Sequence, residues 1–326
     1  MRIFESMRGF QLTAIVKTAI ELGVFSALAE GGSTASDLAV TCRASERGMR
    51  ILCDSLVVEQ LMEKTGGRYR NTPETALFLK RESPAYLGGA AEFLCDPQMS
   101  TSLMNDLTSA VRKGGTMIEG EGTVNPDNPL WVKFARAMAP MMMPAAQAIA
   151  GMVAGSGPLK VLDIAAGHGL FGISIAQRNA QAEITALDWA AVLEVAKENA
   201  AKAGVAARYK TLPGSAFDVD YGSDYDVVLL TNFLHHFDTE TNEKLLRKVH
   251  AALKPGGRAV TLEFSPEDDR VSPPVPARFA LTMLFTTARG DAYTFHELEA
   301  MAHRAGFQSS AHHRLETEQS VIISTK

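Results

Sequence analysis

The segment VLDIAAGHGLFGISIA, residues 161–176, decides the fold class of this chain. It predicts a strand over residues 159–164, a tight turn, and a helix that begins near residue 169. Gly167 and Gly169 suit such a turn, because glycine adopts positive φ and lets a ligand approach the backbone without a Cβ in the way. A turn without a ligand would use the same residues.

The rest of the carboxy-terminal half repeats this alternation of apolar strands and helices. Further strands are expected at 183–188, 206–211, 226–231 and 258–264, with helices at 169–180, 190–203 and 239–253. Near-continuous apolar strands separated by helices are typical of a parallel sheet covered on both faces. Two short strands, 308–315 and 320–326, end the chain as a hairpin. We therefore expect an α/β fold, Rossmann-like and doubly wound, with a mostly parallel seven-stranded sheet.

Acidic residues close the first two strands of this sheet. Asp163 follows the first strand, where a carboxylate suits an ammonium group and not a phosphate. Asp188 ends the second strand, and an acid there accepts hydrogen bonds from both ribose hydroxyls; it is also well placed as a helix N-cap. The glycine spacing lacks the third glycine of a dinucleotide site. A nucleoside with a cationic, phosphate-free tail fits this edge, and S-adenosylmethionine has that description.

Length, charge and cysteine content argue against several other classes of function. The 326 residues carry a formal net charge of -5 and suffice for two domains. An acidic balance argues against nucleic acid or an anionic membrane as partner. Three widely spaced cysteines, no cleavable leader and no run of about 18 apolar residues predict a cytoplasmic chain.

The first 95 residues have a different pattern. Apolar residues recur at helical spacing from Phe4 to Leu28, including Phe10 and Leu22. A second amphipathic helix is expected over 45–59 with Ile51 inward, and MEKTGGRYRNTP reads as a β-hairpin. Helices followed by a hairpin wing indicate a mainly α-helical winged-helix domain.

These two parts together resemble a known family. Residues 159–263, with the acid–glycine turn and the LKPGG turn, look like a class I S-adenosylmethionine-dependent methyltransferase core. The amino-terminal part resembles the dimerisation domain of caffeate- and hydroxyindole-type small-molecule O-methyltransferases and their bacterial tailoring relatives. The resemblance implies a dimerisation domain at 1–95 and a methyltransferase domain at 96–326, divided into a helical connector, 96–158, and a core, 159–326. It also implies a homodimer and a small-molecule acceptor.

The resemblance extends to the cofactor site. The residues expected to bind S-adenosylmethionine are Asp163, Gly167, Gly169, Asp188, Trp189, Gly214, Ser215, Ala216, Phe217 and Asn232. Two positions depart from the family pattern. Ala165 stands where the family has a further glycine, and Ser215 stands where it has the acid that contacts adenine.

The stretch NFLHHFDTE carries the expected catalytic group. His235 matches the family's general base, and histidine side chains, with an ordinary pKa near 6.5, suit removal of a hydroxyl proton. His236 is interpreted as structural. Glu263 matches one of the acids that hold the base, whereas Ala292 replaces the other; the adjacent Asp291 is a possible substitute. No metal is needed, because the sulfonium supplies the leaving group.

The acceptor pocket is expected to include flexible methionines and aromatic rings, which adapt to flat organic molecules. The residues proposed for it are Met138, Met142, Phe279, Met283 and Phe285, all of which would also suit a plain core.

Two other functions stay open from the sequence. The lost acid at Ala292 also fits a C- or N-methyltransferase, or an enzyme that binds the cofactor without transferring its methyl group. A winged-helix DNA-binding regulator would use Arg43, Arg47, Arg50, Lys64, Arg68 and Arg70. These basic residues are interspersed with acidic ones, whereas a DNA-binding domain normally gathers its basic side chains on one surface.

Overall fold

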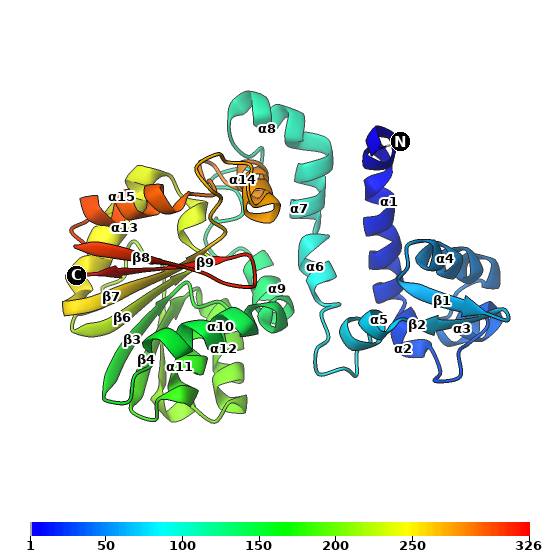
Figure 1. Ribbon diagram of the computed structural model, residues 1–326, viewed down its shortest axis with the longest axis horizontal. Coiled ribbons are helices and arrows are strands. Elements are labelled where there is room, and N and C mark those ends of the chain that lie inside the picture. The colour runs from blue at the N-terminus through cyan, green and yellow to red at the C-terminus, as the bar shows by residue number, and fades with distance from the viewer. Residues whose placement is uncertain (1) are drawn as a thin grey trace. The chain divides into compact units, whose positions relative to one another are not determined.

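The computed structural model describes residues 2–326, and its contacts divide the chain into two compact units. The first unit ends at Cys95 and the second comprises Asp96–Lys326. Within the described residues no helix is both long and apolar enough to cross a bilayer. Figure 1 shows the helical first unit in blue and the sheet of the second unit in green to red.

Helices and one hairpin build the first unit. Its elements are α1 Arg2–Glu21, α2 Val24–Ala27, α3 Ala35–Thr41, α4 Glu46–Val58, β1 Met62–Thr65, β2 Arg68–Asn71, α5 Pro73–Phe78 and α6 Ala90–Leu94. The hairpin is antiparallel, as predicted. Its two-residue turn has φ of 56° at Gly66 and 78° at Gly67, and this left-handed pair matches the twist of the strands.

Two details of the first unit differ from the sequence expectation. The expected single helix over Phe4–Leu28 is wrong, because α1 ends at Glu21 and Gly23 turns the chain with φ of 70°. Phe10 is 56% exposed and Leu22 is 36% exposed, whereas Ala19 and Phe25 are buried, so only the later part of the predicted apolar face packs inside the single chain. Ile51 is 41% exposed, because the buried stripe of α4 is Met49, Cys53 and Leu56.

Basic side chains of the hairpin bind groups of their own unit. The Arg68 guanidinium donates to the carbonyl of Gly32 at 2.9 Å, and Arg70 donates to that of Gly31 at 3.2 Å. Lys64 and Arg50 both pair with Asp54, at 2.5 and 3.0 Å. These charges stabilise the attachment of the hairpin.

The second unit is a three-layer α/β structure. Its elements are α7 Pro97–Thr101, a π-helical turn Ser102–Asp106, α8 Leu107–Lys113, α9 Leu130–Ala137, α10 Ala139–Val153, β3 Leu159–Ile164, α11 Leu170–Arg178, β4 Ala182–Asp188, α12 Ala190–Lys202, β5 Tyr209–Pro213, β6 Tyr225–Thr231, α13 Thr239–Ala252, β7 Leu253–Glu263, α14 Pro274–Thr286, α15 Phe295–Arg304, β8 Ser309–Arg314 and β9 Ser320–Thr325. One core packs α10, α11 and α12 on the sheet, and another packs α13 and α15 on the opposite face.

The sheet confirms the predicted class. Its strand order is β5-β4-β3-β6-β7-β9-β8. The first five strands in this order are parallel, and β9 runs antiparallel to both neighbours. The strand expected at 206–211 begins later, at Tyr209. Arg208 explains the shift, since its guanidinium binds the carbonyls of Asn179, Ala182 and Ala176 at 2.8–3.0 Å before the chain enters the sheet.

Candidate active site

The topology places the site at one crevice. From β3 the chain moves outward to β4 and β5, and then returns to β6 on the other side of β3. Helices on opposite faces of the sheet therefore separate at the carboxyl ends of β3 and β6. Ligands of open α/β sheets bind at such a switch point.

The turn after β3 has three residues in the left-handed region. Their φ values are 54° at Ala165, 56° at Gly167 and 74° at Gly169. A Cβ on Gly167 would come no closer than 3.8 Å to another residue, whereas one on Gly169 would lie 2.5 Å from the Tyr209 hydroxyl. Space at Gly167 therefore leaves room for a ligand, and Gly169 permits close packing of the helix on the sheet.

Asp163 is fully buried beneath this turn. Its Oδ2 accepts the Gly172 N–H at 3.1 Å, and its Oδ1 has no hydrogen-bond partner among the described residues. Burial raises the pKa of this carboxyl to about 8, with only partial compensation from the Gly172 N–H. A nearby cation would favour its charged form.

Asp188 links the ends of the first two strands. Its carboxylate accepts the Gly167 N–H at 2.8 Å and the Trp189 N–H at 2.7 Å. Burial nevertheless raises the pKa of Asp188 to about 6. Trp189, not Asp188, is the N-cap residue of α12, so Asp188 is not the helix cap that the sequence also allowed.

The turn after β5 lies beside these groups in the sheet. The Gly214 N–H donates to the Asp188 carbonyl at 3.0 Å, and the Ser215 hydroxyl accepts the Phe217 N–H at 3.1 Å. Ala216 is buried and Phe217 is 37% exposed. The turn therefore offers an exposed aromatic ring and no carboxylate at residue 215.

Lys248 of α13 holds this turn, which its sequence position does not reveal. Its ammonium donates to the carbonyls of Ala216, Phe217 and Val219 at 3.2, 2.9 and 2.6 Å. A lysine in an amphipathic helix gives no sequence signal of such a long-range role, because it looks like any solvated charge.

Asn232 directly follows β6 with φ of 54°. Its amide nitrogen lies 3.6 Å from the Met142 sulfur, and its carbonyl oxygen accepts the Gln319 amide N–H at 2.7 Å. The structure thus brings together one residue expected at the cofactor and one expected in the acceptor pocket.

His235 and Glu263 form a buried pair. The His235 Nδ1 lies 2.5 Å from Glu263 Oε2, and the two residues are 4% and 2% exposed. The other carboxylate oxygen, Oε1, accepts the N–H groups of Phe233 and Leu234 at 3.2 and 2.9 Å. Since Glu263 is acceptor-only when ionised, it assigns the proton to Nδ1 and leaves Nε2 free to accept one.

His236 lies in an aromatic environment. Its ring centroid is 5.2 Å from that of Trp131 and 4.2 Å from that of His235. Burial, and secondarily the charge of His235, lowers the pKa of His236 well below its ordinary value. His236 therefore stays neutral and does not compete with its neighbour for a proton at neutral pH.

One expected pocket residue lies directly against His235. The Phe279 ring meets the His235 ring edge to face, with centroids 4.8 Å apart. Met138, Met142, Met283 and Phe285 are all buried, with at most 8% exposure.

The acidic partner expected beside residue 292 does not reach the base. Ala292 is fully buried, and the Asp291 carboxylate pairs with Arg270 at 3.2 Å. Asp291 contacts His235 only through its main chain, whose N–H donates to the His235 carbonyl at 3.0 Å. Among the described residues no cluster of three His, Cys, Asp or Glu side chains is arranged for a metal ion.

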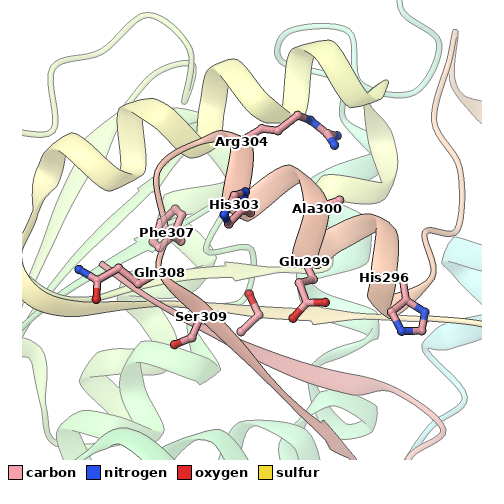
Figure 2. A pocket seen from close by; sticks show the side chains of 9 residues that line it. His296, Glu299, Ala300, His303, Arg304, Phe307, Gln308 and Ser309 are labelled. Atoms are coloured by element: carbon pink, nitrogen blue, oxygen red, sulfur yellow. The ribbon is translucent and has the colours of Figure 1, made fainter.

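A hollow of about 360 Å³ lies elsewhere, between α15 and β8. Figure 2 shows its lining side chains, among them His296, Glu299 and His303. Ser309 at its rim begins β8 and pairs with Thr325, which lies opposite Arg258 near the amino end of the parallel strands. At this end the hollow lies away from the carboxyl edge of the sheet.

Comparison with known proteins agrees with this architecture. A methyltransferase-domain model matches residues 161–257, and an O-methyltransferase dimerisation-domain model matches residues 4–81. A crystal structure from Nostoc punctiforme, described as a candidate O-methyltransferase, is 53% identical, with a TM-score of 0.96 over 99% of this chain and 98% of that one. The 3-hydroxy-5-methyl-1-naphthoate 3-O-methyltransferase of Streptomyces sahachiroi is 29% identical over 86% of this chain and 81% of its own length. Human N-acetylserotonin methyltransferase, solved with S-adenosylmethionine, has the same fold at 23% identity, with a TM-score of 0.88 over 99% and 96% of the two chains.

The sheet, its switch-point crevice and these matches define an S-adenosylmethionine-dependent methyltransferase. More narrowly, the chain belongs to the small-molecule O-methyltransferase family, whose members join an amino-terminal dimerisation domain to a methyltransferase domain.

Proposed function

We propose that this enzyme methylates a hydroxyl oxygen of a small, planar organic acceptor, with His235 as general base. The observation that carries the proposal is the buried pair of His235 Nδ1 and Glu263 Oε2, 2.5 Å apart, at the carboxyl ends of β6 and β7. The name of the Streptomyces relative supports a hydroxylated aromatic acceptor.

The residues at the carboxyl edge fit S-adenosylmethionine. Asp163 has an unpartnered buried oxygen, Gly167 leaves open space at the turn, and Asp188 presents a carboxylate at the end of the second strand. We assign Asp163, Gly167, Gly169, Asp188, Trp189, Gly214–Phe217 and Asn232 to the cofactor. When bound, the cofactor supplies an electrophilic methyl group on a positively charged sulfur.

The side chains of the site then have separate tasks. His235 Nε2 takes the proton of the acceptor hydroxyl as the new carbon–oxygen bond forms and the carbon–sulfur bond breaks. Glu263 fixes the imidazole tautomer and stabilises the imidazolium that results. We assign Phe279, whose ring lies against His235, and the buried Met138, Met142, Met283 and Phe285 to the apolar side of the acceptor pocket, where they would exclude water.

The test uses the purified protein with S-adenosylmethionine and 3-hydroxy-1-naphthoic acid, 2-naphthol and 2-naphthylamine as probes. We expect His235→Ala to lower kcat on a hydroxyl probe by about 10²–10⁴-fold, with the dissociation constant for the cofactor unchanged in calorimetry. His313→Ala, on the exposed face of β8, is the matched control and should keep full rate.

Product analysis separates this proposal from its alternative. A methyl group on oxygen, located by NMR, supports it. A methyl group on carbon or nitrogen with the hydroxyl untouched would instead establish the C- or N-methyltransferase. Full activity of His235→Ala would remove the general base from the mechanism.

A further inference from the structure

The segment Gly290–Tyr293 is packed against the main chain of the histidine turn, Leu234–Phe237. The Asp291 N–H donates to the His235 carbonyl at 3.0 Å, and the Tyr293 hydroxyl donates to the Phe237 carbonyl at 2.6 Å. A Cβ on Gly290 would lie 2.2 Å from the His235 carbonyl oxygen, so the main chains of the two segments are in direct contact. The position of this segment therefore helps to fix the position of His235.

Arg270 binds the same segment from the loop between β7 and α14. Its Nη1 donates to Asp291 Oδ2 at 3.2 Å and to the Ala292 carbonyl at 3.1 Å, and its Nη2 pairs with the Glu297 carboxylate. Glu297 also caps α15 by accepting the Thr294 N–H at 2.9 Å. One planar guanidinium thus joins three acceptors between residue 291 and the first turn of α15.

The backbone of Arg270 is itself unusual. Its φ of 61° lies in the left-handed region, which is unfavourable for any residue other than glycine. Its N–H donates to the Glu267 carbonyl at 2.9 Å, and Asp269 accepts the N–H groups of Val271 and Ser272 at 2.9 Å each. A strained residue held by several contacts is typical of a position that a functional site requires.

We propose that Arg270 is a positioning residue for His235. It holds Gly290–Tyr293 against the histidine turn, and so orients His235 through its main chain, while Glu263 orients the ring. The inference rests on the proposed role of His235. Arg270, whose side chain is 40% exposed, thereby affects the position of His235, which is only 4% exposed.

The loop offers a matched control. Glu267 of the same loop pairs with Arg314 on β8, away from Gly290–Tyr293. Arg314→Gln therefore removes an exposed ion pair from this loop without touching the segment beside His235. If Arg270 acted only by stabilising the loop, the two substitutions would have similar effects.

We expect Arg270→Gln to lower kcat on a hydroxylated naphthalene probe on the order of tenfold or more, because small misplacement of a catalytic group is costly. The dissociation constant for S-adenosylmethionine should stay unchanged. Arg270→Lys should recover part of the rate, since one ammonium can pair with an acid but cannot span three acceptors. Hydrogen exchange of the Asp291 amide should be faster in Arg270→Gln than in the parent or in Arg314→Gln.

A double-mutant cycle decides whether Arg270 acts through His235. In the background of His235→Ala, Arg270→Gln should cause no further loss of rate. A full additional tenfold loss, equal effects of Arg314→Gln and Arg270→Gln, or unchanged Asp291 exchange would each overturn the inference. Full activity of His235→Ala alone would refute the proposed base instead, and is distinguishable because the Asp291 exchange still reports on the contact of Arg270.

Discussion

The buried Asp163 carboxyl makes the free energy of unfolding of the ligand-free protein depend on pH. Burial moves its pKa from 3.8 to about 8, and that of Asp188 from 3.8 to about 6. Between about pH 4 and pH 8, Asp163 and, over a narrower range, Asp188 keep their protons in the folded state, whereas the same carboxyls have released them in the unfolded chain. The free energy of unfolding therefore falls as pH rises from about 4 toward 8, and the stabilising contribution is complete only at acid pH.

We predict that Asp163→Asn weakens this pH dependence. The melting temperature of the ligand-free parent should fall more between pH 5 and pH 9 than that of Asp163→Asn, because an amide cannot ionise. Thermal melts at pH 5, 7 and 9 measure the difference, and Asp218→Asn at an exposed loop position is the control. Parallel curves for parent and Asp163→Asn would contradict the burial argument.

The ionisation of Asp163 should also depend on binding of the cofactor. A sulfonium and an ammonium close to Asp163 would favour its charged form, so binding of S-adenosylmethionine at pH 7 should release protons. Calorimetry in buffers of different ionisation enthalpy counts them, and Asp163→Asn should release fewer. Identical proton release by the two proteins would place the positive charge of the cofactor elsewhere.

At the scale of elements, α13 stabilises the turn after β5. Lys248 bridges three carbonyls of that turn, whereas Lys244, one turn earlier on α13, forms an exposed pair with Glu240 at 2.8 Å. We predict that Lys248→Met lowers the free energy of unfolding by about 2 kcal/mol, because charged hydrogen bonds are lost. It should also weaken cofactor affinity.

Lys244→Met is the matched substitution and should cost under about 0.5 kcal/mol. Urea melts with calorimetric binding compare the two variants. Equal, small effects would show that the turn after β5 needs no support from α13, and the assignment of Gly214–Phe217 to the cofactor would lose its structural basis.

The elements also show what sequence patterns can establish. The strand at 159–164 was predicted at its observed bounds, because a buried parallel strand is apolar throughout and the glycine turn ends it. The pairing of His235 with Glu263 followed from matched family positions, although 28 residues separate them. Local patterns and family motifs therefore recover the sheet and the central pair of the site.

Contacts between distant, polar residues were not accessible in this way. Arg270 and Lys248 look like solvated charges, since nothing in their own neighbourhood specifies the carbonyls that they bind. Ile51 was assigned to the wrong face, because apolar residues of α4 occupy more than one side of the helix and only tertiary packing selects the buried stripe. Ala165 adopts a left-handed conformation with φ of 54°, which the sequence pattern alone does not indicate.

At the scale of the molecule, α1 leaves an apolar surface uncovered. Ile3, Phe4, Met7 and Phe10 are 75%, 55%, 71% and 56% exposed, and their spacing places them along one side of the helix. Contiguous apolar patches of this kind mark interaction sites in globular proteins. The segment belongs to a dimerisation domain by its family match, so we propose that a second copy of the chain covers it.

Replacing Met7 and Phe10 together by Glu should convert the dimer to a monomer. Burial of each large apolar side chain contributes about 1.5–3 kcal/mol, and two introduced carboxylates would also repel their copies across a two-fold axis. Light scattering coupled to size exclusion measures the mass over a range of concentrations. Val40→Glu, on α3 at a residue that is 79% exposed, is the control and should leave the dimer intact. Since the substituted residues already face solvent in the single chain, the far-ultraviolet circular dichroism should not change.

A parent protein that is monomeric at every concentration, or a dimer that Val40→Glu dissociates equally well, would show that α1 is not the interface.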